Sequence, residues 1–138
     1  MICTFFGHRD APYSITEKLC QFIEHLIVDR GIDTFYVGNN GNFDSAATAV
    51  LAKMQKKHPY IRCFTIVAYM PKPQDTFVFE TIYPDSLETT PYRFAIAKRN
   101  EWMVRNSDYV ICYVICNGGA SKYKTMAEKL NKTVINLI

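Results

Sequence analysis

The chain has 138 residues and a formal net charge of +3, with 49% hydrophobic and 21% charged residues. This length fits one domain with its own core, and the composition excludes a disordered chain. Apolar runs such as 110–116 are far below the roughly 18–20 residues that cross a bilayer. Arg9 and Asp10 interrupt the first apolar stretch, so no signal segment is expected. We therefore expect a single cytoplasmic domain over residues 1–138 that does not act at a membrane.

Apolar residues alternate along the chain between strand-like runs and helical periodicity. Strands are predicted at residues 2–6, 34–37, 61–70, 109–115 and 133–138. Helices are predicted between them, at about 14–30, 42–58, 92–106 and 119–130. At the start of the first helix, Ser14 and Glu17 have the spacing of a capping box. Gly31 is expected to end that helix.

The predicted strands are apolar on both faces, which is typical of a parallel sheet covered by helices on both sides. The expected fold class is α/β: a single Rossmann-like, doubly wound domain with a mainly parallel sheet of about five strands. Residues 71–91 break this alternation, since they contain four prolines and show little periodicity. A loop of this length in a compact domain is often functional, so we predict a lid or flap at 71–91.

The chain contains five cysteines, an odd number. Cys3, Cys63 and Cys112 lie in predicted core strands, which favours buried free thiols in a reducing compartment. The cysteines and the scattered histidines have no metal-ligand spacing. We expect neither a metal site nor a cofactor.

Three predicted strands end in loops that are rich in glycine and polar residues. Sheets of this kind bind ligands beyond the carboxyl ends of their strands, and glycine-rich backbone at a helix start suits an anion. Arg9 can add a bidentate fork to a phosphate. The alternative is that each glycine only turns the chain. The candidate ligand-binding residues in these loops are Gly7, His8, Arg9, Gly38, Asn39, Asn40, Gly41, Asp44, Gly118, Gly119, Ala120 and Ser121.

These loops contain no standard nucleotide-binding motif. Neither GxGxxG after the first strand nor GxxxxGK[ST] occurs, which argues against a nicotinamide dehydrogenase and a P-loop NTPase. Asp44 lies in the first turn of the second predicted helix. Its carboxylate either favours the helix dipole or accepts hydrogen bonds from a ribose or an amine.

The predicted helix at 92–106 places polar residues on an apolar face. Arg99 and Asn100 follow Ile96 by three and four residues and share its face with Met103. A buried arginine needs partners. The two residues therefore either point into a ligand cleft or form a structural network with a neighbouring loop.

Four motifs follow one another along the chain: the Gly7-His8-Arg9 loop, the turn from Gly38 to Asp44, the Arg99-Asn100 pair and the Gly118-Gly119 loop. In their order and placement they resemble the SLOG superfamily, which joins the Rossmann domain of DNA-processing protein A (Smf) with the LOG phosphoribohydrolases. The resemblance covers nearly the whole chain and is closest to the small bacterial DUF1273 branch. It implies a nucleotide or nucleotide-derived ligand at the strand ends. Related domains commonly pair, which leaves a homodimer open.

The sequence departs from the hydrolase members shortly after the loop that ends at Ser121. Where those enzymes carry a catalytic glutamate, this chain has Lys124 and Thr125. Glycosidic hydrolysis needs a carboxylate, and Asp44, Glu101 and Glu128 are the remaining candidates.

Three hypotheses about function follow. The favoured one is a binding module or sensor for a nucleotide or nucleotide-sugar. The alternative is a nucleotide N-glycosidase of the LOG type. Single-stranded DNA binding is the least favoured, because a net charge of +3 is small for that role.

Overall fold

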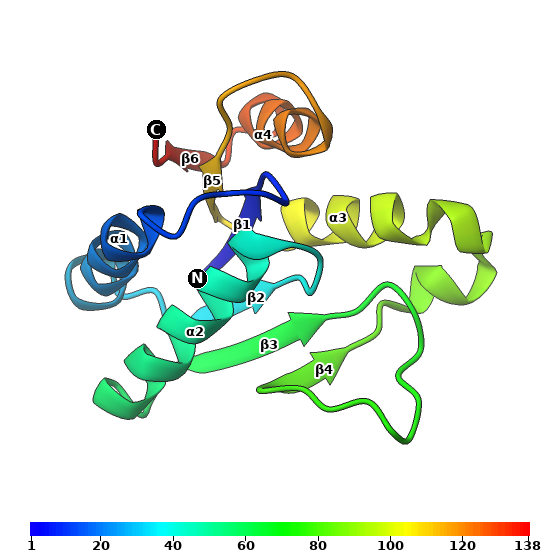
Figure 1. Ribbon diagram of the computed structural model, residues 1–138, viewed down its shortest axis with the longest axis horizontal. Helices are drawn as coiled ribbons and strands as arrows, with labels where there is room; N and C mark the ends of the chain where they lie inside the picture. Colours follow the sequence, from blue (N-terminus) through cyan, green and yellow to red (C-terminus); the bar gives the residue numbers. More distant parts are fainter.

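The computed structural model describes residues 1–138, and its centre is one parallel sheet of six strands in the order β4-β3-β2-β1-β5-β6. Two short 3-10 helices, η1 and η2, precede the third α-helix (Figure 1). In chain order the elements are β1 (Ile2–Gly7), α1 (Ile15–Arg30), β2 (Thr34–Val37), α2 (Asn42–Lys57), β3 (Arg62–Ile66), β4 (Glu80–Ile82), η1 (Asp85–Thr89), η2 (Tyr92–Phe94), α3 (Ala95–Arg105), β5 (Tyr109–Tyr113), α4 (Gly119–Lys129) and β6 (Thr133–Asn136).

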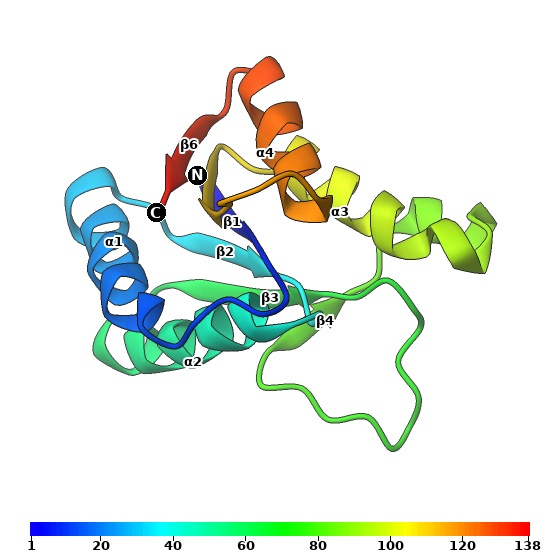
Figure 2. The same cartoon turned by 45° about the horizontal axis from the view of Figure 1, so that its top comes forward.

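Helices cover both faces of the sheet. The helices α1 and α2 pack together on one face, and α3 and α4 pack together on the other (Figures 1 and 2). Alternate residues of β1 serve the two sides, because successive strand side chains point to opposite faces. Phe5 joins the core under α1 and α2, whereas Phe6 joins the core under α3 and α4. The predicted Rossmann-like α/β class is thus confirmed.

The sheet has six strands rather than the five expected. The additional strand, β4, lies inside the segment predicted as a lid or flap and pairs in parallel with β3. Three residues are too few to show a strand periodicity in a proline-rich stretch. Phe79 and Leu87 flank β4 and are buried, so residues 79–89 belong to the packed domain. The exposed part, within 71–78, lies in the connection between β3 and β4.

The start of α1 also differs from the prediction. Ser14 has helical backbone angles and makes no side-chain hydrogen bond as an N-cap, so the predicted capping box is wrong. The reason is that a turn precedes the helix: the backbone N–H groups of Ile15 and Thr16 donate to Pro12 O and Tyr13 O. At the other end, Gly31 ends α1 with a left-handed φ of 69°, as predicted.

Cys3, Cys63 and Cys112 are buried free thiols, as their positions in core strands predicted. Burial raises the pKa of Cys63 to about 12 and that of Cys112 to about 11, so these thiols stay protonated and unreactive. No helix of the chain combines the length and the apolar character needed to cross a bilayer.

Candidate functional site

Parallel strands bring the predicted loops to one edge of the sheet. The chain leaves β1 toward β2 on one side and later returns to pair β5 on the other, so the strand order reverses beside β1. Ligands of open α/β sheets bind at such a reversal. A cavity of about 370 Å³ opens there, and we call it the strand-end cavity. The predicted residues that line it are Gly7, Arg9, Gly38, Asn40, Asp44, Arg99, Asn100, Gly119 and Ala120.

Arg99 is the most deeply buried charge at this site, with only 2% of its surface exposed. Its Nη1 donates hydrogen bonds to Ile66 O at 2.9 Å and to Asn39 Oδ1 at 3.1 Å. Its Nε donates to Asn100 Oδ1 at 2.8 Å. The helix face predicted for Arg99 and Asn100 is therefore confirmed, and part of the guanidinium belongs to a structural network.

The Nη2 group of Arg99 remains available. It has no hydrogen-bond partner in the chain, whereas the other two nitrogens are bonded. Ser107 Oγ is the one fully buried side-chain polar atom that lacks a hydrogen-bond partner. The unbonded Nη2 of Arg99 is therefore not fully buried. A guanidinium carries five donors, so Arg99 keeps N–H groups for a ligand in the cavity.

No carboxylate lies within 4 Å of Arg99 to form an ion pair. The charge of Asp44 is close enough to act on it, and Gly38 lies between the two. A Cβ atom on Gly38 would come within 2.7 Å of Asp44 Oδ2 and 3.5 Å of Arg99 Cζ. Glycine at this position thus allows the loop after β2 to pass between the carboxylate and the guanidinium.

Asp44 lies in the first turn of α2 and is half-buried. Its Oδ2 accepts a hydrogen bond from the backbone N–H of Asn40 at 2.9 Å, which fixes the turn before the helix. Burial raises the pKa of Asp44 to about 6, although the Asn40 bond and the charge of Arg99 act in the opposite direction. The carboxyl group therefore titrates close to neutral pH.

The cavity has more positive than negative charge. Arg9 and Arg93 line it from the exposed side, and Arg99 lines it from the interior. Asp44 is the one acidic side chain in the lining. Three arginines and one carboxyl group in the lining favour an anionic ligand, and each arginine can bind a phosphate with two N–H groups.

Two of the predicted glycines have a role in folding. A Cβ atom on Gly7 would lie 2.2 Å from Cγ of Phe43, so Gly7 allows α2 to pack against β1. Gly41 has a φ of +111°, and a Cβ atom there would lie 2.8 Å from Cα of Arg9. Gly41 does not line the strand-end cavity, although Gly7 does.

The loop before α4 is different. A Cβ atom on Gly118 or Gly119 would meet no other atom within 4 Å, and neither residue has a left-handed φ. The fold therefore does not require glycine at these positions. The first N–H groups of a helix have no partner within it, and Gly119 and Ala120 bring the start of α4 to the cavity wall.

Of the remaining loop residues, His8 connects two strand ends. Its Nε2 accepts a hydrogen bond from the backbone N–H of Ile115 at 3.0 Å, and its ring meets Tyr113 edge-on. Asn39 is bound to Arg99 from outside the strand-end cavity. Gly118 and Ser121 flank the cavity residues of α4 without lining it.

Only one of the three candidate catalytic carboxylates lies in the cavity. Asp44 lines it, whereas Glu101 accepts a hydrogen bond from Arg105 and Glu128 accepts one from Lys124, both at 3.1 Å. No group of three His, Cys, Asp or Glu side chains is close enough to hold a metal ion.

Sequence reasoning missed Arg93 and Tyr123, which also line the cavity. Arg93 lies in η2, a short element that shows no periodic pattern. Tyr123 is a buried residue of α4 that borders the cavity, and its hydroxyl donates to Ala97 O at 3.4 Å. An aromatic residue one turn after the Gly118-Gly119 loop was the available signal.

A search against protein-family models finds no match for this chain, and no curated protein is significantly similar to it. The resemblance to the SLOG superfamily therefore rests on the motifs and their order.

Proposed function

We propose that this chain binds a nucleotide or a nucleotide-derived small ligand in the strand-end cavity, as a sensor or binding module. The observation that carries the proposal is Arg99, a buried cation with no ion-pair partner and with Nη2 free for a ligand. Burying an unpaired charge is costly, so a bound anion would stabilise it. The motif resemblance favours a nucleotide over other anions.

In this proposal, a phosphate group lies between Arg99 and the start of α4. The N–H groups at Gly119 and Ala120 donate from the helix terminus, and Arg9 approaches from the solvent side. A volume of about 370 Å³ is at the lower end of the range for small-molecule sites, which suits a phosphate with part of its sugar.

A thermal-shift screen tests this function. The ligands are mononucleotides, cyclic nucleotides, ADP-ribose and inorganic phosphate, with the uncharged nucleoside adenosine as a control. A ligand at 100 times its dissociation constant adds about 2.7 kcal/mol of stability. We expect stabilisation by at least one phosphorylated compound and none by adenosine at the same concentration. If no phosphorylated compound stabilises the chain, the proposal is wrong.

A second candidate function is hydrolysis of the N-glycosidic bond of a nucleotide, and Asp44 is the observation that favours it. A general acid or base works best with a pKa near the working pH, and the pKa of Asp44 is about 6. The assay is incubation with adenosine monophosphate and detection of free adenine by chromatography. The binding-module proposal expects no adenine above the protein-free control.

The enzyme alternative makes a sharper prediction. It expects robust release of adenine that falls by about 10²–10⁴-fold in Asp44→Asn. Glu101→Gln and Glu128→Gln are matched controls, because both carboxylates lie outside the cavity and should leave the rate unchanged. Adenine release that is lost in Asp44→Asn alone would replace the binding module with the enzyme.

A further inference from the structure

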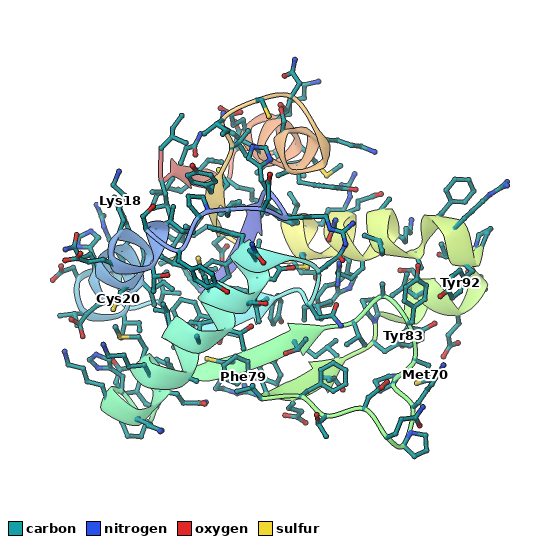
Figure 3. All side chains as sticks on the ribbon, in the orientation of Figure 1. Lys18, Cys20, Met70, Phe79, Tyr83 and Tyr92 are labelled. Carbon is teal, nitrogen blue, oxygen red and sulfur yellow. The ribbon has the colours of Figure 1, made fainter.

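A second cavity adjoins the strand-end cavity on the side of β3. Its volume is about 450 Å³, and the two cavities share Asn40, Ile96 and Arg99 in their linings. Its outer wall is formed by the connection from β3 to β4 and by η2. Figure 3 shows Met70 and Tyr92, both in this wall, at the end of the molecule that lies farthest from Cys20 on α1.

Aromatic side chains are concentrated in this wall. Tyr69, Phe77 and Tyr92 all line the cavity. The rings of Tyr69 and Tyr92 are stacked, with their centroids 4.3 Å apart and 24° between their planes. The hydroxyl of Tyr69 donates to the backbone oxygen of Tyr92 at 3.2 Å, which fixes the pair across two chain segments.

The fold does not bury these rings. Tyr92 is 75% exposed and Tyr69 is 36% exposed, so the stacked pair leaves aromatic surface open at the cavity. A tyrosine that only anchored the loop would stabilise the fold more if its ring were buried. A rigid, open aromatic surface is the kind of platform on which a nucleobase stacks.

The cavity also offers hydrogen-bonding groups for the edge of a planar ring. The side-chain oxygen of Asn39 is used by Arg99, whereas its Nδ2 has no partner in the chain. Gln74 lines the same cavity. Amide side chains carry both donors and acceptors, which match the ring nitrogens and exocyclic groups of a base.

We propose that this second cavity holds the base of a nucleoside monophosphate whose phosphate lies in the strand-end cavity. The inference rests on the proposed function, because Arg99 connects the two cavities and would hold the phosphate. The base stacks on the Tyr69–Tyr92 pair, and the amide of Asn39 contacts its edge. The residues within 71–78 then form part of the wall of the base site.

Isothermal titration with three probes separates the two sites: inorganic phosphate, ribose 5-phosphate and adenosine monophosphate. The test variant is Tyr92→Ala, which removes an exposed ring and keeps the backbone oxygen that Tyr69 binds. Tyr13→Ala is the matched control, since Tyr13 is an exposed tyrosine outside both cavities. Tyr92→Phe keeps the ring and should behave as the parent.

We expect the parent to bind adenosine monophosphate more tightly than ribose 5-phosphate. Tyr92→Ala should weaken binding of adenosine monophosphate by about 5–100-fold and leave ribose 5-phosphate unchanged. Equal affinity of the parent for the two compounds would overturn the base site while the phosphate site stands. An equal loss for both probes in Tyr92→Ala would overturn it too, by showing a structural role. If none of the three probes binds, the proposed function fails and this inference fails with it.

Discussion

The strand-end cavity and the groove between α1 and α2 are both hollows in the surface, and they differ in how their charges are arranged. The groove is larger, at about 730 Å³ against about 370 Å³. In the groove, Glu24 is paired with Lys57 at 2.7 Å and with His58 at 3.2 Å. In the strand-end cavity, Arg99 is buried without an ion pair. Because burying a charge without an ion pair is costly, we propose the strand-end cavity, and not the larger groove, as the ligand site.

The largest expected effect is that of Arg99→Met on ligand binding. Removing the buried partner of a phosphate should weaken binding of adenosine monophosphate by about 30-fold or more, since truncating one partner of a buried charge pair costs about 2–5 kcal/mol. Arg99→Lys should recover part of the loss, because it restores the charge without the planar fork. The measurement is isothermal titration. Unchanged affinity in Arg99→Met would contradict the proposal that the ligand binds in the strand-end cavity rather than in the groove.

A pair of glycine variants tests which glycines of the strand-end cavity the fold requires. Gly7→Ala should destabilise the chain by about 1–3 kcal/mol, because its Cβ atom would overlap the ring of Phe43. Gly119→Ala should leave stability within about 0.5 kcal/mol of the parent, because its Cβ atom meets no other atom within 4 Å. Denaturant unfolding of the ligand-free variants gives both values. A destabilised Gly119→Ala would show that the fold itself needs this glycine.

The contributions of Asp44 and Glu24 to the free energy of unfolding should change with pH in opposite directions. The pKa of Asp44 is raised to about 6 from an ordinary value of 3.8, so the stability linked to its protonated form is lost as the pH rises through 6. Asp44→Asn should therefore become more stable than the parent between pH 4 and 7, by on the order of 2 kcal/mol.

Glu24 is the counterpart in the groove. Hydrogen bonds from Lys57 and His58 lower its pKa, so its contribution is present above the unfolded pKa of about 4.3 and is lost as the pH falls. Glu24→Gln should be less stable than the parent at pH 7, with a difference that narrows at pH 3. Thermal unfolding over this range checks both variants. If Asp44→Asn and Glu24→Gln were both stabilised, or both destabilised, relative to the parent at pH 7, the predicted difference between the two carboxylates would be wrong.

The smallest expected effect is that of Arg9→Ala. Arg9 is exposed, so its loss should weaken binding of adenosine monophosphate by only about tenfold, a little over 1 kcal/mol. Lys53→Ala removes the same charge from the groove and should change nothing. Titrations at two salt concentrations check this, because a contact to phosphate at the surface weakens with salt. Equal losses in the two variants would indicate a general charge effect.

Much of the fold could be predicted because most strands are visible in the sequence as apolar runs. The strands β1 and β5 are buried on both faces, and their sequences show it. The strand β4 could not be predicted, since three residues at the edge of a sheet carry no periodic signal. The absence of a cap at Ser14 depends on the turn before α1, which the capping-box pattern does not include.

The candidate site was predictable in part for a similar reason. Arg99 and Asn100 were found because helical spacing places them on the same face as apolar residues. Spacing cannot say which carboxylate reaches a cavity, and the structure was needed to place Asp44 inside it and Glu101 and Glu128 outside. The role of Gly7 was also hidden, because it depends on contact with a distant helix.

The central claim is that the strand-end cavity, rather than the larger groove, binds the phosphate of a nucleotide. Amide chemical shifts of the labelled chain, followed by NMR during titration with adenosine monophosphate, test it most directly. We predict the largest changes at Gly7, Gly38 and Gly119, in loops that meet at the cavity. Changes confined to groove residues such as Cys20 and Ala49 would contradict the claim, as would a spectrum that no phosphorylated ligand alters.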